Sequence, residues 1–195
     1  MPLRNRVDPE GALHAVPQRM GWFGNRGCLH DAGGAIRRGW QGRRWITCAL
    51  SFKGRRRAPM PPGAYTGLFF LDEATAYAAG HRPCAECRRE AWLRFRDLWA
   101  ERYGEDKADA IDARLHAARL AGRARRLVEW PAEAVPLGAM VLDGGPLLRI
   151  ATGWARWSFD GYTPAAAPRG RVALLTPEPL ARLMADGLAV QIAGQ

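Results

Sequence analysis

The most visible shortage in this sequence is lysine. The chain of 195 residues has 29 lysines and arginines against 19 acidic residues, a formal net charge of +10, yet only Lys53 and Lys107 are lysines. Long hydrophobic runs are also missing: the first residues lack the apolar segment of a signal peptide, and no stretch approaches the roughly 18 apolar residues that span a membrane. We therefore expect no membrane partner and a cytoplasmic location, or association with the nucleoid if the protein binds DNA.

Cysteine is scarce as well. The four cysteines are Cys28, Cys48, Cys84 and Cys87, and a reducing cytosol disfavours disulfide bonds between them. Cysteines in this compartment bind metal, take part in catalysis, or pack as small apolar side chains. Because 48% of the residues are hydrophobic, we expect one well-packed domain or two small ones.

Arginine supplies nearly all of the positive charge. Its planar guanidinium matches phosphate groups and stacks on bases, so the excess favours a nucleic-acid partner over a merely solvated surface. Trp22, Trp40 and Trp45 are interleaved with basic residues, a pattern typical of base stacking but also compatible with a core. The residues that we expect at a nucleic-acid interface are Asn25, Arg26, His30, Arg43, Arg44, Arg55, Arg56, Arg57 and Arg88.

Strands and helices alternate in residues 1–128, which indicates an α+β fold. The patterns predict strands over 44–52 and 64–71, followed by a short helix that is capped by Asp72 and ended by Gly80. A longer helix is predicted to follow Cys84 and to run to about Tyr103, and a third helix to cover 106–127. A basic, proline-rich loop at 53–63 separates the two strands and cannot be helical.

Residues 129–195 have a different composition, with short strands between Gly/Pro turns. A hairpin is predicted around Asp143-Gly144-Gly145, followed by a strand over 170–177 and a short helix over 177–187. We therefore expect a small β-rich, barrel-like second module. Its aromatic residues are either a nucleic-acid-binding face or the module's own core, namely Trp154, Trp157, Phe159 and Tyr162.

The Cys84-Ala-Glu-Cys87 segment lies at the start of the longer helix and allows three interpretations. A thioredoxin-like redox pair requires a preceding strand in a βαβ unit, whereas a helix precedes this one. A zinc deaminase shares the Pro-Cys-x-x-Cys element, but its upstream metal ligand is followed two positions later by a catalytic glutamate. Neither Cys28 nor Cys48 has a glutamate at that position. A metal knuckle, in which two thiolates at a turn chelate one ion, remains the favoured interpretation.

A longer string around this knuckle resembles the zinc-binding N-terminal domain of the Ada methylphosphotriester DNA repair proteins. That family shows a strand, a short helix rich in Ala and Glu, and then Ala-Gly-aromatic-Arg-Pro-Cys-x-x-Cys. The matching residues here are Ala79, Gly80, Arg82, Pro83, Cys84 and Cys87, with His81 at the aromatic position. The resemblance covers residues 45–95 and implies a zinc-stapled β-β-α domain with flanking helices, bound Zn²⁺, and a role in DNA repair.

The sequence departs from that family at the upstream ligands. The family has two of them close together, usually as Cys-x-x-x-Cys, whereas Cys48 has no cysteine beside it. Methyl transfer to an upstream cysteine is therefore not carried over. The resemblance implies a structural zinc site made by Cys48, Cys84, Cys87 and a fourth ligand, for which Cys28 is preferred and His30, His81 and His116 are rivals.

Asp112, His116 and Arg119 are spaced to share one face of the predicted third helix. A carboxylate that orients a histidine beside an arginine is a minimal acid–base site, although such a pair is often only solvated. The main hypothesis is a DNA-binding zinc protein of repair or processing. The alternatives are a nucleic-acid hydrolase or glycosylase that uses Asp112 and His116, and an adaptor that binds proteins through its C-terminal module.

Overall fold

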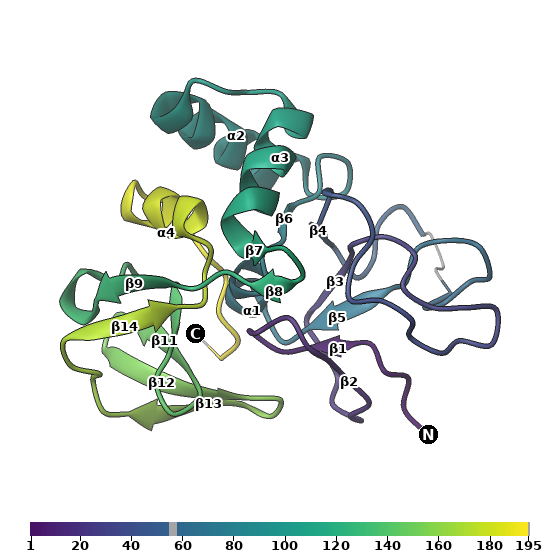
Figure 1. Ribbon diagram of the computed structural model, residues 1–195, viewed down its shortest axis with the longest axis horizontal. Coiled ribbons are helices and arrows are strands. Elements are labelled where there is room, and N and C mark those ends of the chain that lie inside the picture. Colours follow the sequence, from purple (N-terminus) through teal and green to yellow (C-terminus); the bar gives the residue numbers. More distant parts are fainter. Residues whose placement is uncertain (55–57, 195) are drawn as a thin grey trace.

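Two six-stranded sheets lie at opposite ends of the long axis of the molecule, with helices between and above them (Figure 1). The structure is a computed structural model that describes residues 1–54 and 58–194. The mixed architecture confirms the predicted α+β class. None of the helices in the described part of the chain combines the length and the apolar character that a membrane span requires.

The N-terminal sheet is mixed and has the strand order β2-β1-β5-β3-β4-β6. Its strands are β1 (Arg6–Val7), β2 (Leu13–His14), β3 (Trp22–Asn25), β4 (Ile46–Cys48), β5 (Leu68–Phe70) and β6 (Arg82–Pro83). β4 and β5 lie within the predicted strands over 44–52 and 64–71 but are shorter. β4 pairs in parallel with β6, with Thr47 opposite Pro83, so the end of β4 lies beside the start of the cysteine knuckle.

Local signals define most of the helix ends. Helix α1 (Glu73–Ala78) begins at Asp72, whose side chain accepts a hydrogen bond of 2.8 Å from the backbone of Thr75. Helix α2 (Arg89–Tyr103) ends at Gly104, which has the left-handed conformation expected of a helix stop. It begins later than predicted because the segment from Cys84 to Arg88 forms a turn.

The third helix is shorter than predicted. Helix α3 (Ala108–Arg119) stops at Leu120, and the remaining residues form a hairpin of β7 (Leu120–Ala121) and β8 (Ala124–Arg125). Gly122, with φ of +64°, makes the turn at little cost, whereas a helix would have continued through a glycine at a penalty. The prediction of helix over 120–127 is therefore wrong, because Ala, Leu and Arg favour a helix only while the chain can continue it.

The C-terminal sheet is antiparallel and has the order β13-β12-β11-β10-β14-β9. Its strands are β9 (Val128–Pro131), β10 (Met140–Leu142), β11 (Pro146–Ile150), β12 (Gly153–Ser158), β13 (Gly161–Ala165) and β14 (Arg171–Leu174); a short 3-10 turn, η1 (Ala132–Ala134), follows β9. β10 and β11 form the predicted hairpin, and helix α4 (Glu178–Ala185) lies where a short helix was expected. Within the described residues no pairing joins the edge strands β13 and β9, so the sheet is open and the barrel-like expectation is corrected.

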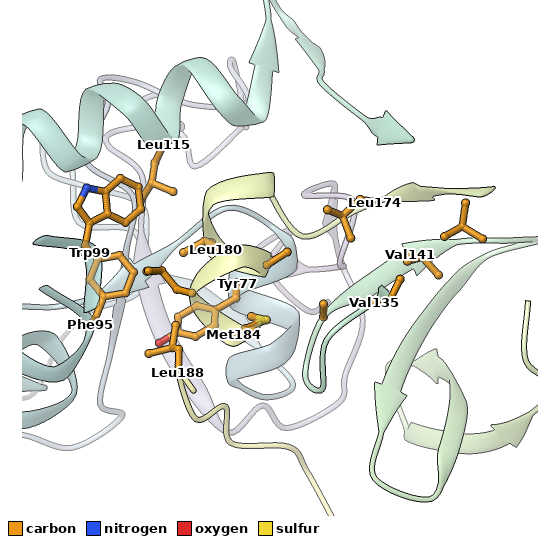
Figure 2. Packing of buried hydrophobic residues seen from close by; sticks show 14 of the residues in the cluster. Tyr77, Phe95, Trp99, Leu115, Val135, Val141, Leu174, Leu180, Met184 and Leu188 are labelled. Carbon is orange, nitrogen blue, oxygen red and sulfur yellow. The ribbon is translucent and has the colours of Figure 1, made fainter. Parts of the chain in front are cut away.

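The largest core crosses the predicted boundary between residues 128 and 129. Trp92, Phe95 and Trp99 of α2 and Ile111 and Leu115 of α3 pack in one cluster with residues of the C-terminal sheet and α4. Figure 2 shows this cluster, in which Leu180 and Met184 of α4 lie between the aromatic side chains of α2 and the sheet residues. The helical layer and the C-terminal sheet thus bury their apolar faces against each other.

Candidate metal site and arginine-rich face

Three of the four predicted metal ligands come together in one cluster. The Sγ atoms of Cys48, Cys84 and Cys87 all lie within 4.8 Å of one another. Cys48 is the last residue of β4, and the other two belong to the turn after β6. The parallel pairing of β4 with β6, with the hydrogen bond of 2.9 Å from the backbone N–H of Cys84 to the carbonyl of Thr47, fixes the approach of the two segments.

Backbone N–H groups surround the sulfur atoms of this cluster. Those of Cys87 and Glu86 donate to the sulfur of Cys84, and that of Ala49 donates to the sulfur of Cys87. Such outer hydrogen bonds stabilise negative sulfur and orient ligands toward a metal ion. The turn that creates the Cys-x-x-Cys spacing also supplies two of these donors.

The three thiols differ in acidity. A hydrogen bond from Cys48, together with the backbone N–H groups of Cys87 and Glu86, lowers the pKa of Cys84 to about 5, despite the opposing effect of burial. The hydrogen bond to Cys84 and burial raise the pKa of Cys48 above its usual range, and burial raises that of Cys87. Cys84 is therefore the most acidic of the three thiols, and binding of a metal ion, which requires thiolates, would release the protons that the cluster still holds.

The donor set fits a thiophilic metal ion such as Zn²⁺. Three sulfur ligands meet at one point, and aromatic side chains shield them, because Phe23, Tyr65 and Phe69 pack against the cysteine cluster. No fourth cysteine, histidine or carboxylate joins the group within residues 1–54 and 58–194.

Cys28, the preferred fourth ligand, is not part of this cluster. Its thiol lies 3.5 Å from the carbonyl oxygen of His30, and its backbone N–H donates to the side chain of Gln41. The rival ligands are also engaged elsewhere. The imidazole of His30 contacts the hydroxyl of Thr66 at 2.6 Å, and that of His116 lies against Trp40 with its ring centroid 4.7 Å away.

His81, at the position that is aromatic in the Ada motif, packs among aromatic side chains. It is fully buried, with ring centroids 4.7 Å from Phe70 and 5.3 Å from Trp45. Burial, together with the charges of Arg26 and Arg119, holds the pKa of His81 well below its usual range. The ring is therefore neutral and serves in packing.

Asp112 and His116 do not form a pair. Both carboxylate oxygens of Asp112 accept hydrogen bonds from buried Arg82, at 2.9 and 2.7 Å, and in the described part of the chain none links Asp112 to His116. Instead, Nδ1 of His116 lies 3.2 Å from Nη2 of Arg119. Burial, with the charges of Arg119 and Arg43, lowers the pKa of His116, which therefore stays neutral at physiological pH.

The predicted nucleic-acid residues divide into two environments. Arg43 and Arg44 are exposed and, with half-buried Asn25, line one cavity of about 520 Å³, whose other lining residues include Asp109 and Asp112. Arg26, His30 and Arg88 are buried or nearly so, and Arg88 pairs with Glu73 and lies over the ring of Trp22. Arg55, Arg56 and Arg57 lie outside the described residues.

Arg38 and Trp40 lie in the loop that leads to exposed Arg43 and Arg44. Arg38 is exposed, and half-buried Trp40 lies two positions further along the same loop, between Arg37 and Arg44. Arg37 pairs with Asp31 and Arg44 with Asp109. Arg38 and Arg43 have no carboxylate partner in residues 1–54 and 58–194. In the sequence, this loop is marked by the string Arg37-Arg38-Gly39-Trp40. Composition alone did not distinguish this string from the other pairs of arginines.

Two aromatic residues of the C-terminal module, Trp157 and Tyr162, contact helix α1 and its N-cap, and Phe159 lies against His14 and Trp157. Tyr162 donates a hydrogen bond of 2.8 Å to Asp72, the N-cap of α1, and the indole of Trp157 donates to the hydroxyl of Thr75. Trp154 is buried in the large core. Of the two possibilities left open by the sequence, these contacts match burial rather than an exposed binding face.

Comparisons with known proteins leave this site to be argued from its own geometry. No protein-family model, no curated protein and no solved structure matches the chain.

Proposed function

We propose that this protein is a zinc-containing, nucleic-acid-binding protein that acts on DNA in repair or processing. The loop of residues 37–44, here called the arginine loop, is the proposed contact surface. The observation that carries the proposal is a set of two exposed arginines, Arg38 and Arg43, which have no carboxylate partner among the described residues and lie on either side of half-buried Trp40. Arginine forks bind phosphates while an indole stacks on a base, which is the usual division of labour on single-stranded nucleic acid.

The arginine loop is held in place by the rest of the molecule. The guanidinium of buried Arg119 donates to the carbonyl of Arg43 at 2.5 Å, and the indole of Trp45 donates to the carbonyl of Gly42 at 3.1 Å. The backbone of Gln41 passes so close to Gly27 that a Cβ there would lie 2.4 Å from its carbonyl oxygen. A loop that is already ordered loses less entropy on binding, which supports its use as a recognition surface.

The proposed zinc ion would act on the same loop through β4. Trp45 directly follows the loop, and Cys48 ends the strand β4 that comes next, so a metal ion on Cys48, Cys84 and Cys87 would tie this strand to β6. Three protein ligands leave a fourth position for water or another small ligand. The zinc-stapled β-β-α unit implied by the Ada resemblance is proposed in this form.

The enzyme alternative has less support. Asp112 is held by Arg82, and Nδ1 of His116 faces Arg119, so no hydrogen bond orients His116 toward Asp112 in the described part of the chain. The cavity beside Asn25 and Arg43 nevertheless offers room for a base or phosphate next to the arginine loop.

The test is a binding titration with fluorescent DNA, single-stranded and double-stranded, over a range of salt concentrations. The variant Arg38→Ala/Arg43→Ala should weaken binding and reduce the slope of log Kobs against log salt by about 1.4 for single strands or 1.8 for duplex, because two phosphate contacts are lost. The matched control is Arg94→Ala/Arg169→Ala, which removes the same charge from two exposed positions outside the loop.

Equal losses in both double variants would assign binding to net charge and overturn the assignment to the arginine loop. Absence of binding to any oligonucleotide at low salt would remove the nucleic-acid function altogether. Trp40→Ala should further weaken single-strand binding by about ten-fold or more, the usual worth of one stacked base.

A further inference from the structure

Two buried arginines, Arg26 and Arg119, and half-buried Arg125 gather near Trp45 without a carboxylate partner among the described residues. Arg26 and Arg119 lie over its ring, with guanidinium carbons 4.9 and 3.8 Å from the centroid, and Arg125 belongs to the hairpin that follows α3. None of the three forms an ion pair in the described part of the chain. Burial is the main cause that lowers the pKa of Arg26 and Arg125 to about 10 and that of Arg119 to about 9. Positive charge is thus concentrated here, and the carboxylates of Asp8, Glu10 and Asp112 act on it only from a distance.

Backbone carbonyls satisfy these guanidinium groups only in part. Arg26 donates to Gly11, Arg119 to Gly80 and Arg43, and Arg125 to Ala78 and Leu175. The Nε atoms of all three arginines are buried and have no partner among the described residues. A buried donor without an acceptor lowers stability, so a ligand or water from outside the chain would stabilise these Nε atoms by accepting their hydrogen bonds.

A cavity of about 150 Å³ opens beside them. Arg26 and Arg125 line it together with Arg123, and Trp40 and Trp45 contribute aromatic walls. Exposed residues, among them Arg123 and Glu10, also line it, so solutes can enter. The volume is below the roughly 300 Å³ of pockets that enclose a whole drug-sized ligand, and it suits a single small group.

The carboxylates of Asp8 and Glu10 favour the charged form of Arg125, but neither forms an ion pair with the arginines of this cavity. The carboxylate of Asp8 is already engaged by the backbone N–H of Ala12 at 2.9 Å and by the imidazole of His14 at 2.7 Å. Glu10 is exposed and lines the cavity without an ion pair to any of its arginines. Neutral His81 is buried against Trp45 and adds no negative charge.

We propose that this cavity binds the phosphate group of a phosphate monoester, with Arg26 and Arg125 as inner ligands and Arg123 at the entrance. Guanidinium forks match the oxygens of a phosphate, and its double charge offsets the uncompensated arginines. The organic part of the ligand lies outside the cavity, beside half-buried Trp40. The proposal uses residues other than Arg38 and Arg43 and stands without the proposed nucleic-acid function.

The phosphate has two possible sources, a free metabolite or the phosphorylated end of a nucleic-acid strand. Isothermal titration calorimetry and thermal unfolding with inorganic phosphate, at ionic strength matched by chloride, test the shared chemistry. We expect saturable binding and a rise in Tm with phosphate that chloride does not reproduce. A nucleoside monophosphate and a pair of identical oligonucleotides, one 5′-phosphorylated and one with a 5′-hydroxyl, then distinguish the sources.

Arg123→Ala should weaken phosphate binding by about ten-fold or more, the effect of losing one charge-assisted hydrogen bond. Arg123 is exposed, so this variant should fold normally, and Arg169→Ala is the control with the same change in charge. The proposal fails if millimolar phosphate neither binds nor raises Tm more than chloride does, or if Arg123→Ala and Arg169→Ala bind phosphate equally. Phosphate binding retained by Arg38→Ala/Arg43→Ala would separate this cavity from the arginine loop, whatever the fate of the DNA-binding proposal.

Discussion

The ion pair between Arg82 and Asp112 allows the sharpest test of how this structure is held together. Both side chains are only 3% exposed, and the carboxylate accepts two hydrogen bonds, from Nε at 2.9 Å and from Nη2 at 2.7 Å. The guanidinium also lies over the ring of Trp92, 4.4 Å from its centroid. The pair joins β6, immediately before the cysteine knuckle, to helix α3.

Replacing Asp112 by Ala should lower the free energy of unfolding by about 3–5 kcal/mol, because it leaves a buried guanidinium without its counter-charge. Asp109→Ala is the matched control on the same helix. Asp109 is 88% exposed and pairs with Arg44 at 3.1 Å, so its loss should cost no more than about 1 kcal/mol. Urea titrations of the zinc-loaded protein, followed by circular dichroism and tryptophan fluorescence, measure both values.

A second variant separates the burial of charge from the loss of packing. Arg82→Leu/Asp112→Leu removes both charges, and it should be less destabilising than Asp112→Ala, since no unpaired charge remains. A cost of Asp112→Ala below about 1 kcal/mol, or a double variant that is the least stable of all, would refute the reasoning. The first result would also return Asp112 to consideration as a catalytic residue.

Two further predictions concern the cysteines and His81. Cys84→Ser should abolish stoichiometric zinc in the purified protein and lower its Tm, whereas Cys28→Ser should leave zinc content unchanged; metal analysis decides, and equal loss in both would place Cys28 among the ligands. The folded state holds His81 neutral while the unfolded state takes up a proton below pH 6.5, so stability should fall as pH drops below that value, by at most about 1.4 kcal/mol per pH unit. Urea titrations at pH 7, 6 and 5 should show a smaller fall for His81→Leu than for the unaltered protein, and identical slopes would contradict this account.

Features that depend on neighbouring residues could be predicted from the sequence. The N-cap at Asp72, the helix stop at Gly104 and the hairpin of β10 and β11 follow from local signals, and the structure contains all three. The hairpin after α3 was not predicted because most of its residues favour a helix, and Gly122 alone has a low helix propensity.

Features that depend on distant pairing could be predicted only in part. The sequence spacing placed Cys84 and Cys87 at one turn, but the parallel pairing of β4 with β6, which brings Cys48 to them, is set by the whole sheet. Charge did not predict which residues are exposed. Arg26 and Arg88 were expected at the surface because arginines are rarely buried, but the fold buries both side chains. The carbonyls, aromatic rings and acidic partner that surround them come from elements far away in the sequence.

The core shared by helices α2 and α3 and the C-terminal sheet determines how the chain can unfold and be divided. Since Phe95, Trp99 and Leu115 pack in one cluster with Leu180 and Met184 of α4 and with residues of the C-terminal sheet, a fragment that ends at residue 128 would expose a broad aromatic surface to water. Neither fragment would then be a stable unit, and unfolding of the whole chain should occur in one cooperative transition. Fragments 1–128 and 129–195, produced separately, should instead recover native structure only when mixed, each acting as the folding partner of the other.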